Sequence, residues 1–237
     1  MGTLINALAI IAGSLIGLVL KKGINIGMES AINKSLGLAV IVIGINGFIS
    51  NMFSINGGKL ESKGELMLVV YLVVGTVIGT ALHLDDRLNG IGAFLEKRFK
   101  LTDFSTGFVN ASLLFCIGAM AIVGALNDGL LHDPEVLIIK SALDFTAAII
   151  LSASMGIGVL ASFVPVLVYE GGITLAAGAL GGVLQGALLG DICTVGYVII
   201  FAIGINFLFA GKIKTANLLP CLLLPCVAHL IFAMLGR

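Results

Sequence analysis

The stretch LIIKSALDFTAAII, at residues 137 to 150, sets two charged residues inside a run of otherwise apolar and small side chains. Lys140 and Asp144 are four residues apart, so on a helix their side chains share a face and can pair. An ionised carboxylate inside a bilayer costs a few kcal/mol, so such residues usually face protein or water and carry function. The stretch therefore predicts a membrane helix with a polar site.

The composition of the whole chain agrees with a membrane location. Of 237 residues, 59% are apolar and 11% are charged, whereas a soluble domain carries about 25% charged residues. So few charges cannot cover a soluble core, which predicts an integral membrane protein. Thirteen basic and thirteen acidic residues balance, so we expect no nucleic-acid partner.

The cysteines give no sign of a metal or cofactor site. They form no CxxC pair and have no histidine at metal-ligand spacing. We therefore expect small buried thiols, with no metal and no cofactor. The four cysteines are Cys116, Cys193, Cys221 and Cys226.

Apolar runs divide the chain into candidate membrane spans, each of which needs about 20 mostly apolar residues. They lie at 3–20, 35–53, 66–84, 105–127, 142–163, 172–190, 193–210 and 217–236. These runs predict an all-α polytopic bundle of seven or eight spans, with a broken or re-entrant segment between residues 142 and 210. The connectors at 25–35 and 86–99 are amphipathic, so we expect them to lie along the membrane surface.

Lysine and arginine in the loops predict the orientation, because cytoplasmic loops are rich in them. With the N-terminus outside, nine of these residues fall on the cytoplasmic side and four on the outer side, so we expect that orientation in a bacterial inner membrane. The cytoplasmic set is Lys21, Lys22, Lys34, Arg87, Lys97, Arg98, Lys100, Lys212 and Lys214, and the outer set is Lys59, Lys63, Lys140 and Arg237.

Weak self-similarity predicts an internal repeat. Asn6-Ala7 matches Asn110-Ala111, Lys34-Ser35 matches Lys140-Ser141, and IGIN occurs at 43–46 and again at 203–206. We expect 3–84 to repeat as 107–190 in inverted orientation, with additional helices at 193–236, as in many transporters. Chance similarity of small and aliphatic residues is the alternative. The position that matches Asp144 is Leu38.

Glycines at helical spacing predict close helix packing. A strip of small residues lets another backbone approach, or else it lines a narrow permeation path. These strips also lead us to expect a homodimer. The glycines are Gly13 and Gly17, Gly75 and Gly79, and the series Gly178, Gly182, Gly186 and Gly190.

The Asn-Asp-Gly sequence at 127–129 predicts a turn between two spans. The next helix would begin with Asp133 as N-cap and Pro134 at its first position. That helix carries Lys140 and Asp144. Either they form a structural ion pair, or Asp144 binds a cation or proton in a water-filled cavity.

Further polar residues are candidates for a substrate or ion site. Glu170 interrupts an apolar run and either joins the site or caps a helix at the interface. The segment LLPCLLLPC at 218–226 predicts a kinked or broken last span, or a simple hinge. The amides either bond across helix interfaces or ligate an ion. Besides Asp144, Lys140 and Glu170, the candidates are Asn6, Asn46, Asn110, Asn206 and Asp128.

Several segments resemble the bacterial membrane-protein family typified by YqgA and YdfK. They are CIGAMAIVGALNDGL at 116–130, LIIKSALD at 137–144, GIGVLAS at 156–162, the late IGIN, and LLP at 218–220. The resemblance covers nearly the whole chain and is most specific from residue 116 to residue 144. It implies a multi-pass inner-membrane protein but no activity, because the family is one of unknown function.

These features predict a small secondary transporter or channel-like permease for a small ion or small polar solute, with its site around Asp144. A non-transporting scaffold or sensor is the alternative. An intramembrane enzyme is a weaker reading, because HExxH, GxSxG and the phosphate-loop pattern are missing from the sequence, so we expect no enzymatic activity. A water-accessible Asp144 would favour transport, and a sealed, paired one the scaffold. The expected partners are the bilayer and the solute.

Overall fold

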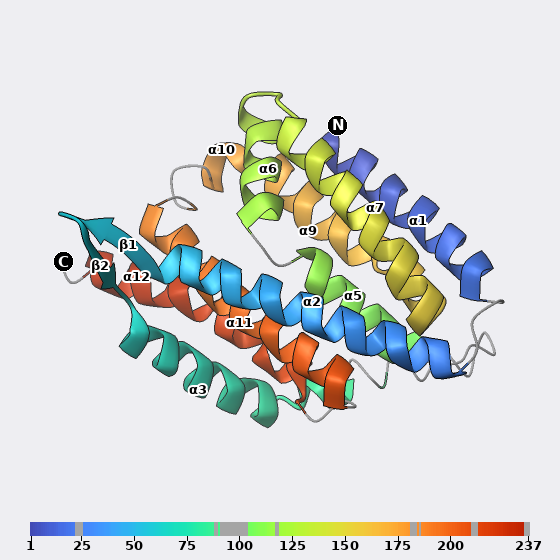
Figure 1. Ribbon diagram of the computed structural model, residues 1–237. Helices are drawn as coiled ribbons and strands as arrows, with labels where there is room; N and C mark the ends of the chain where they lie inside the picture. The colour runs from blue at the N-terminus through green and yellow to red at the C-terminus, as the bar shows by residue number, and fades with distance from the viewer. Residues whose placement is uncertain are drawn as a thin grey trace. The chain divides into compact units, whose positions relative to one another are not determined.

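The computed structural model describes residues 1–21, 26–87, 90, 104–116, 119–180, 184, 186–209 and 213–234. Its helices are α1 (Gly2–Lys21), α2 (Ile26–Met52), α3 (Glu65–Ala81), α5 (Phe104–Cys116), α6 (Ala119–Leu130), α7 (Glu135–Met155), α8 (Gly158–Ala161), α9 (Phe163–Leu175), α10 (Ala177–Leu180), α11 (Gly186–Phe209) and α12 (Leu224–Met234), with the 3-10 helix η1 (Thr215–Leu222). Strands β1 (Phe53–Asn56) and β2 (Lys59–Ser62) form one antiparallel hairpin. The expected all-α class is thus confirmed (Figure 1).

Several of these segments have the length and apolarity of a membrane span. Six qualify: Gly2–Lys21, Ser30–Met52, Glu135–Met155, Gly158–Leu175, Gly186–Phe209 and Thr215–Phe232. A seventh qualifies if α5 and α6, bent by 60° to each other, count as one broken span. Helix α3 is apolar but only 17 residues long. The chain is a polytopic membrane protein, with six or seven such spans among its described residues and an eighth if α3 also crosses.

The boundaries of the later spans differ from those expected. The span expected at 172–190 is wrong, because α9 ends at Leu175 and α11 begins only at Gly186. In place of the span expected at 142–163, α7 runs from Glu135 to Met155. It ends there because Gly156 follows with a φ of 81°. The bend expected between residues 142 and 210 falls between α5 and α6 instead. Small and aliphatic residues continue through all these breaks, so hydropathy cannot locate them.

The two expected surface connectors have different outcomes. The first, at 25–35, is not a separate helix, because α2 is continuous from Ile26 to Met52. The second, at 86–99, lies mostly outside the described residues.

The first compact unit comprises residues 1–35 and 88–183, and α1 packs along α7 within it. A methyl group on Gly13 would lie 2.4 Å from the Phe145 carbonyl oxygen, and one on Gly17 would lie 2.2 Å from that of Ile149. Glycine is therefore required for this close backbone approach. Because the two residue numbers rise together, α1 and α7 are parallel, and Figure 1 shows them side by side.

The second compact unit comprises residues 36–87 and 184–237, and α2 packs against α11 within it. Gly44 faces Phe201 and Gly204 faces Ile41, so these two helices are antiparallel. The two IGIN segments therefore run in opposite directions, as an inverted repeat requires. The repeat of 3–84 in 107–190 itself stays a prediction.

Helix α3 packs against η1 in the second unit through another glycine pair. Gly75 contacts Cys221, and a methyl group on Gly79 would lie 2.0 Å from the Asn217 carbonyl oxygen. Pro220 lies inside the 3-10 helix, and α12 follows it. The last span, Thr215–Phe232, therefore changes from a 3-10 helix to an α-helix at Leu223, but it counts as one span rather than as a broken one.

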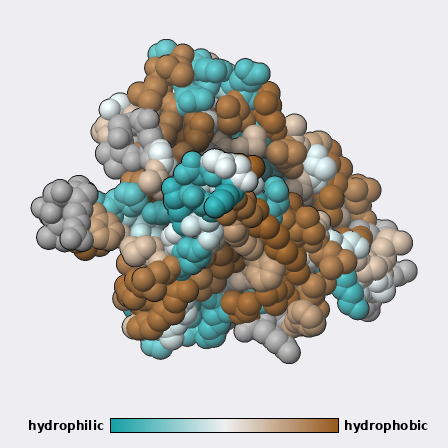
Figure 2. Space-filling view, turned by 60° about the vertical axis from the view of Figure 1, so that its left-hand side comes forward, coloured by the Kyte–Doolittle hydropathy of each residue, from teal (hydrophilic) through white to brown (hydrophobic). Residues whose placement is uncertain are grey.

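Apolar side chains cover much of the molecular surface, and Figure 2 shows them in brown on the face that it presents. This is the surface that a lipid environment stabilises, because hydrocarbon is as apolar as leucine. Examples are Leu8, Leu15 and Val19 on α1 and Leu66, Val73 and Val77 on α3.

Candidate functional site

Helix α7 brings Lys140 and Asp144 onto one face, as their spacing predicts. Asp133 accepts a hydrogen bond from the Glu135 N–H at 3.0 Å at the start of the helix. The helix begins at Glu135, one residue later than expected, with Pro134 just before it. The Lys140 ammonium donates a hydrogen bond to the Asp144 carboxylate.

Two further helices add partners to this pair. Glu170, in the middle of α9, lies 3.2 Å from the Lys140 ammonium. The Asn6 amide of α1 donates to both Glu170 oxygens, at 3.0 and 3.2 Å. The alternative that Glu170 caps a helix at the interface is therefore wrong. Three helices thus join four polar side chains, and we call Asn6, Lys140, Asp144 and Glu170 the charged cluster.

The charged cluster is buried and carries unequal charges. The exposed fractions are 8% for Asp144, 6% for Lys140 and 0% for Glu170. Asp144 lies about 13 Å along α7 from Glu135, at 1.5 Å per residue, which is close to the middle of a span. When all three groups are ionised, two carboxylates and one ammonium leave one negative charge in excess.

Buried polar atoms without a partner occur beside the charged cluster and deeper in the α1–α7 interface. Among the described residues, these atoms are the Asn6 Oδ1, the Ser14 Oγ and the Ser152 Oγ. Ser14 follows Asn6, and Ser152 follows Asp144, by the same two helical turns or about 12 Å. Such atoms are usually satisfied by ordered water or an ion. We call Asn6, Ser14 and Ser152 the polar line, whose two hydroxyls lie about two helical turns from the cluster on α1 and α7.

Asp128 serves a different part of the first unit. The turn expected at 127–129 is wrong, because α6 continues to Leu130. Helix propensity and packing override the Asn-Asp-Gly signal here. The Asp128 carboxylate accepts the Gly2 N–H at 2.9 Å and lies 2.8 Å from the Met1 nitrogen. It therefore binds the N-terminus of α1 rather than joining the cluster.

The other candidate amides do not meet at the cluster. Asn110 is buried on α5, and Asn46 is exposed on α2. The Asn206 side chain donates to the Ile213 carbonyl at 2.7 Å and accepts its N–H at 2.9 Å, which fixes the turn after α11. Of the four amides, the structure thus brings only Asn6 together with the charged residues.

The four-residue series of glycines is not one packing strip. Gly178 lies in α10, Gly186 and Gly190 lie in α11, and Gly182 lies outside the described residues. A methyl group on Gly178, Gly186 or Gly190 would meet nothing within 4 Å. The expectation of a strip on one helix is therefore wrong, because the chain leaves the helix between these positions.

Sequence reasoning missed Ser14 and Ser152. Each serine lies two helical turns after a candidate site residue, and this spacing could have pointed to them. Spacing alone was not enough, because buried serines in apolar helices usually bond the backbone of their own helix. Ser141 does so, donating to the Leu137 carbonyl at 2.6 Å. Only the packed structure distinguishes Ser14 and Ser152, which have no partner among the described residues.

Comparison with known proteins agrees with the geometry of a membrane protein. The sequence profile described as "Protein of unknown function (DUF554)" matches residues 1–230. The chain is 31% identical over 235 residues to the "Uncharacterized membrane protein YdfK" of Bacillus subtilis (strain 168), covering 99% of this chain and 98% of the relative. It is 27% identical over 230 residues to the "Uncharacterized protein YqgA" of Escherichia coli (strain K12), covering 94% and 93%. No solved structure matches the chain.

The resemblance drawn from the segments between Cys116 and Asp144 is therefore confirmed over nearly the whole chain. The chain belongs to the DUF554 family of proteins of unknown function, as the match over residues 1–230 shows.

Proposed function

We propose that the protein is a small secondary transporter or channel-like permease whose charged cluster binds the moving cation or proton. The supporting observation is the charge count: two buried carboxylates, Asp144 and Glu170, share the single ammonium of Lys140. An uncompensated buried charge is costly by several kcal/mol. Uptake of one proton or one small cation removes that cost.

The neighbours of the cluster suit this role. The Asn6 Oδ1 has no hydrogen-bond donor among the described residues and offers a neutral oxygen ligand beside the carboxylates. Lys140 bonds both acids, so an incoming cation competes with its ammonium for the same oxygens. Such competition gives two states, one with Lys140 between both acids and one with the cation in its place. Ser14 and Ser152 supply polar atoms further along α1 and α7.

The burial of the charged cluster away from solvent favours the alternative, a non-transporting scaffold. Asp144 is paired and only 8% exposed, which is the sealed arrangement expected of a structural counter-charge. A neutral pair of one acid and one base, such as Asp144 with Lys140 alone, would fit that structural role fully. The excess acid, Glu170, is what favours ion binding over a structural role.

Ion flux in proteoliposomes tests the proposal. The purified chain is placed in vesicles, a proton or Na⁺ gradient is imposed, and entry is followed with an internal pH dye or with labelled Na⁺. We expect flux above empty vesicles, and we expect Asp144→Asn and Glu170→Gln to abolish it. Glu135→Gln, an exposed acid on the same helix, is the matched control and should keep it. Absence of flux for both ions, or full flux in Asp144→Asn, would reject transport through the cluster.

A second pair of variants tests the polar line. Ser14→Val and Ser152→Val put apolar groups where the unpartnered hydroxyls lie, so we expect flux to fall in both. Ser141→Val is the control, because its hydroxyl bonds its own helix. Equal flux in all three would show that ions do not pass along α1 and α7.

Other parts of the proposal rest on the sequence. We infer a bacterial inner-membrane location with the N-terminus outside from the nine-to-four distribution of basic residues. We propose a homodimer without enzymatic activity. Gly13, Gly17, Gly75 and Gly79 contact helices of their own chain and so do not form the dimer interface.

A further inference from the structure

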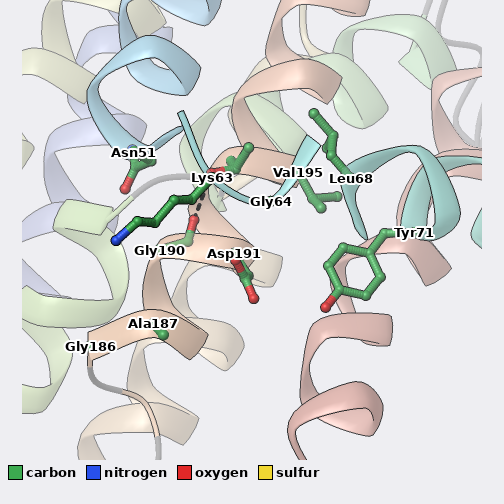
Figure 3. A pocket seen from close by; sticks show the side chains of 11 residues that line it. Asn51, Lys63, Gly64, Leu68, Tyr71, Gly186, Ala187, Gly190, Asp191 and Val195 are labelled. Atoms are coloured by element: carbon green, nitrogen blue, oxygen red, sulfur yellow. Dashed lines mark hydrogen bonds between the residues drawn. The ribbon is translucent and has the colours of Figure 1, made fainter. Parts of the chain in front are cut away.

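A second polar site lies entirely within the second compact unit. A pocket of about 250 Å³ lies where the end of the β hairpin meets α3 and α11. Its polar lining includes Lys63 after β2, Tyr71 on α3, and Asp191 and Thr194 on α11. Figure 3 shows these elements converging around the Asp191 carboxylate. The proposed transport function does not use this pocket.

The pocket holds opposite charges that do not pair with each other. Within the described part of the chain, the Lys63 ammonium makes no ion pair, and it is more than 4.0 Å from the Asp191 carboxylate. Asp191 instead directs one oxygen, Oδ2, to His229 Nε2 at 2.9 Å. Its other oxygen, Oδ1, has no donor among the described residues and remains available to the pocket. Both charges are thus open to a ligand.

Tyr71 adds a second polar group on the Asp191 side. Its side chain is buried, with 4% of the residue exposed. No residue that the structure describes forms a hydrogen bond to its hydroxyl, and Tyr71 lines the pocket. Figure 3 shows the Tyr71 hydroxyl and the Asp191 carboxylate directed to the same part of the pocket. This side suits a ligand ammonium.

The opposite side of the pocket suits a carboxylate. Gly186 and Ala187, the first two residues of α11, line it. The first N–H groups of a helix have no acceptor within it, and they attract anions. In the view of Figure 3, the Lys63 side chain extends toward this side and away from Tyr71. A helix N-terminus and an ammonium without an ion pair among the described residues therefore both line the pocket.

We propose that this pocket binds a small zwitterionic solute of amino-acid size. Its ammonium binds Asp191 Oδ1 and the Tyr71 hydroxyl, and its carboxylate binds Lys63 and the first amides of α11. The volume of about 250 Å³ equals the share of roughly eight liquid waters, which fits a solute of this size. The inference concerns binding alone and goes beyond the transport function, so either can fail without the other.

Isothermal titration calorimetry of the purified full-length chain tests the inference without any gradient. The probes are L-alanine, β-alanine and 4-aminobutyrate, which carry both charges at increasing separation. Propionate and propylammonium carry one charge each. We expect at least one zwitterion to bind, and each single-charge probe to bind about tenfold more weakly, because it leaves one charged contact unmade.

Matched variants assign the two ends of the pocket. Lys63→Met should weaken zwitterion and propionate binding about tenfold and leave propylammonium unchanged, because it removes only the carboxylate partner. Tyr71→Phe and Asp191→Asn should weaken zwitterion and propylammonium instead. Lys59→Met changes an exposed lysine of the same hairpin outside the pocket and should have no effect. If Asp191→Asn fails to fold, Lys63→Met at its exposed site still decides the question.

Three results would overturn the inference. They are no binding of any zwitterion, equal affinities in the Lys63→Met and Lys59→Met variants, and propylammonium binding as tight as the best zwitterion. The last result would make the pocket a simple cation site.

Discussion

Glu170 determines the character of the charged cluster at the scale of single residues. It is fully buried, and it holds Asn6 from α1 and Lys140 from α7 at the same time. Without Glu170, Lys140 and Asp144 would be a neutral pair inside one helix. With it, Lys140 must balance two acids, so a change of one charge affects all three groups.

The first prediction follows from that sharing. Lys140→Met should destabilise the protein by about 3–5 kcal/mol, because it leaves two buried acids without a counter-charge. The double variant Lys140→Met with Asp144→Leu should recover only part of the stability, since Glu170 stays unpaired. Adding Glu170→Met should recover most of the remainder. Thermal unfolding in detergent measures the series, and a double variant as stable as the wild type would show that Glu170 is not part of the balance.

The second prediction concerns pH and an exposed pair of the second unit. The Lys214 ammonium, 2.8 Å from Asp86, lowers the pKa of that carboxylate below its ordinary value through a hydrogen bond and its charge. A carboxyl group whose pKa is lower in the folded than in the unfolded protein stabilises the fold at pH values above its unfolded pKa, which is about 3.9 for aspartate. This contribution to stability is lost as the pH falls through the folded pKa. The difference in Tm between wild type and Asp86→Asn should therefore be present at neutral pH and vanish in acid.

Lys214→Met is the matched variant for this pair. It should show the same Tm difference from wild type, with the same loss in acid. The effect should be small, because both side chains are exposed and screened by solvent. A difference that grows as the pH falls would contradict the assignment.

Part of the cluster could be predicted from sequence and part could not. Lys140 and Asp144 lie one helical turn apart, so their pairing follows from local geometry alone. Asn6 and Glu170 come from other helices, and the contact between them depends on how α1 packs against both α7 and α9. Hydropathy contains no information on which face of each helix turns inward.

At the scale of helices, glycine decides which pairs come closest. Gly13 and Gly17 bring the α1 backbone against α7, and Gly75 and Gly79 do the same for α3 and η1. The series that begins at Gly178 has the same spacing in sequence but meets open space. Spacing therefore indicates a packing strip only where one helix runs through all its positions.

The third prediction compares two such glycines. Gly17→Ala adds a methyl group 2.2 Å from the Ile149 carbonyl oxygen, where the backbone must shift. We expect a loss of about 1–3 kcal/mol, as for other overpacked sites. Gly178→Ala is the control, because its methyl group meets nothing within 4 Å, and its effect should stay within about 0.5 kcal/mol. Thermal unfolding of both variants checks the difference, and equal stability would refute the packing role.

The fold class was predictable at this scale, and the helix boundaries were less so. A charge content of 11% and eight apolar runs predict a helical membrane protein correctly. The runs between residues 142 and 210 have almost uniform hydropathy, so their division depends on backbone breaks such as Gly156. The Asn-Asp-Gly turn at 127–129 failed for the opposite reason, because a strong local signal was overridden by a continuous helix.

For the whole molecule, orientation in the membrane follows from helix directions together with the loop charges. Parallel α1 and α7 and antiparallel α2 and α11 are the directions that alternate crossing requires when α3 crosses the membrane and the bent pair α5–α6 crosses it once. With the N-terminus outside, the hairpin at Lys59 and the turn at Leu131 both face out. The segment at Ser30 then faces the cytoplasm.

The fourth prediction tests this arrangement. On a background without the four native cysteines, Lys59→Cys and Leu131→Cys should react with an impermeant maleimide added to intact cells. Ser30→Cys should react only after permeabilisation, because it lies on the other side. All three residues are exposed in the structure. The reverse labelling pattern would show that the N-terminus is inside.

The contact between Asn6 and Glu170 also constrains how the chain is made. The two residues are 164 positions apart, so at 5 to 20 residues per second the ribosome adds Glu170 roughly 8 to 33 s after Asn6. Asn6 and Lys140 are therefore both synthesised before the acid that binds them. The cluster can form only once α9 has been made, and a chain whose synthesis stalls before α9 lacks the partner that Asn6 and Lys140 share.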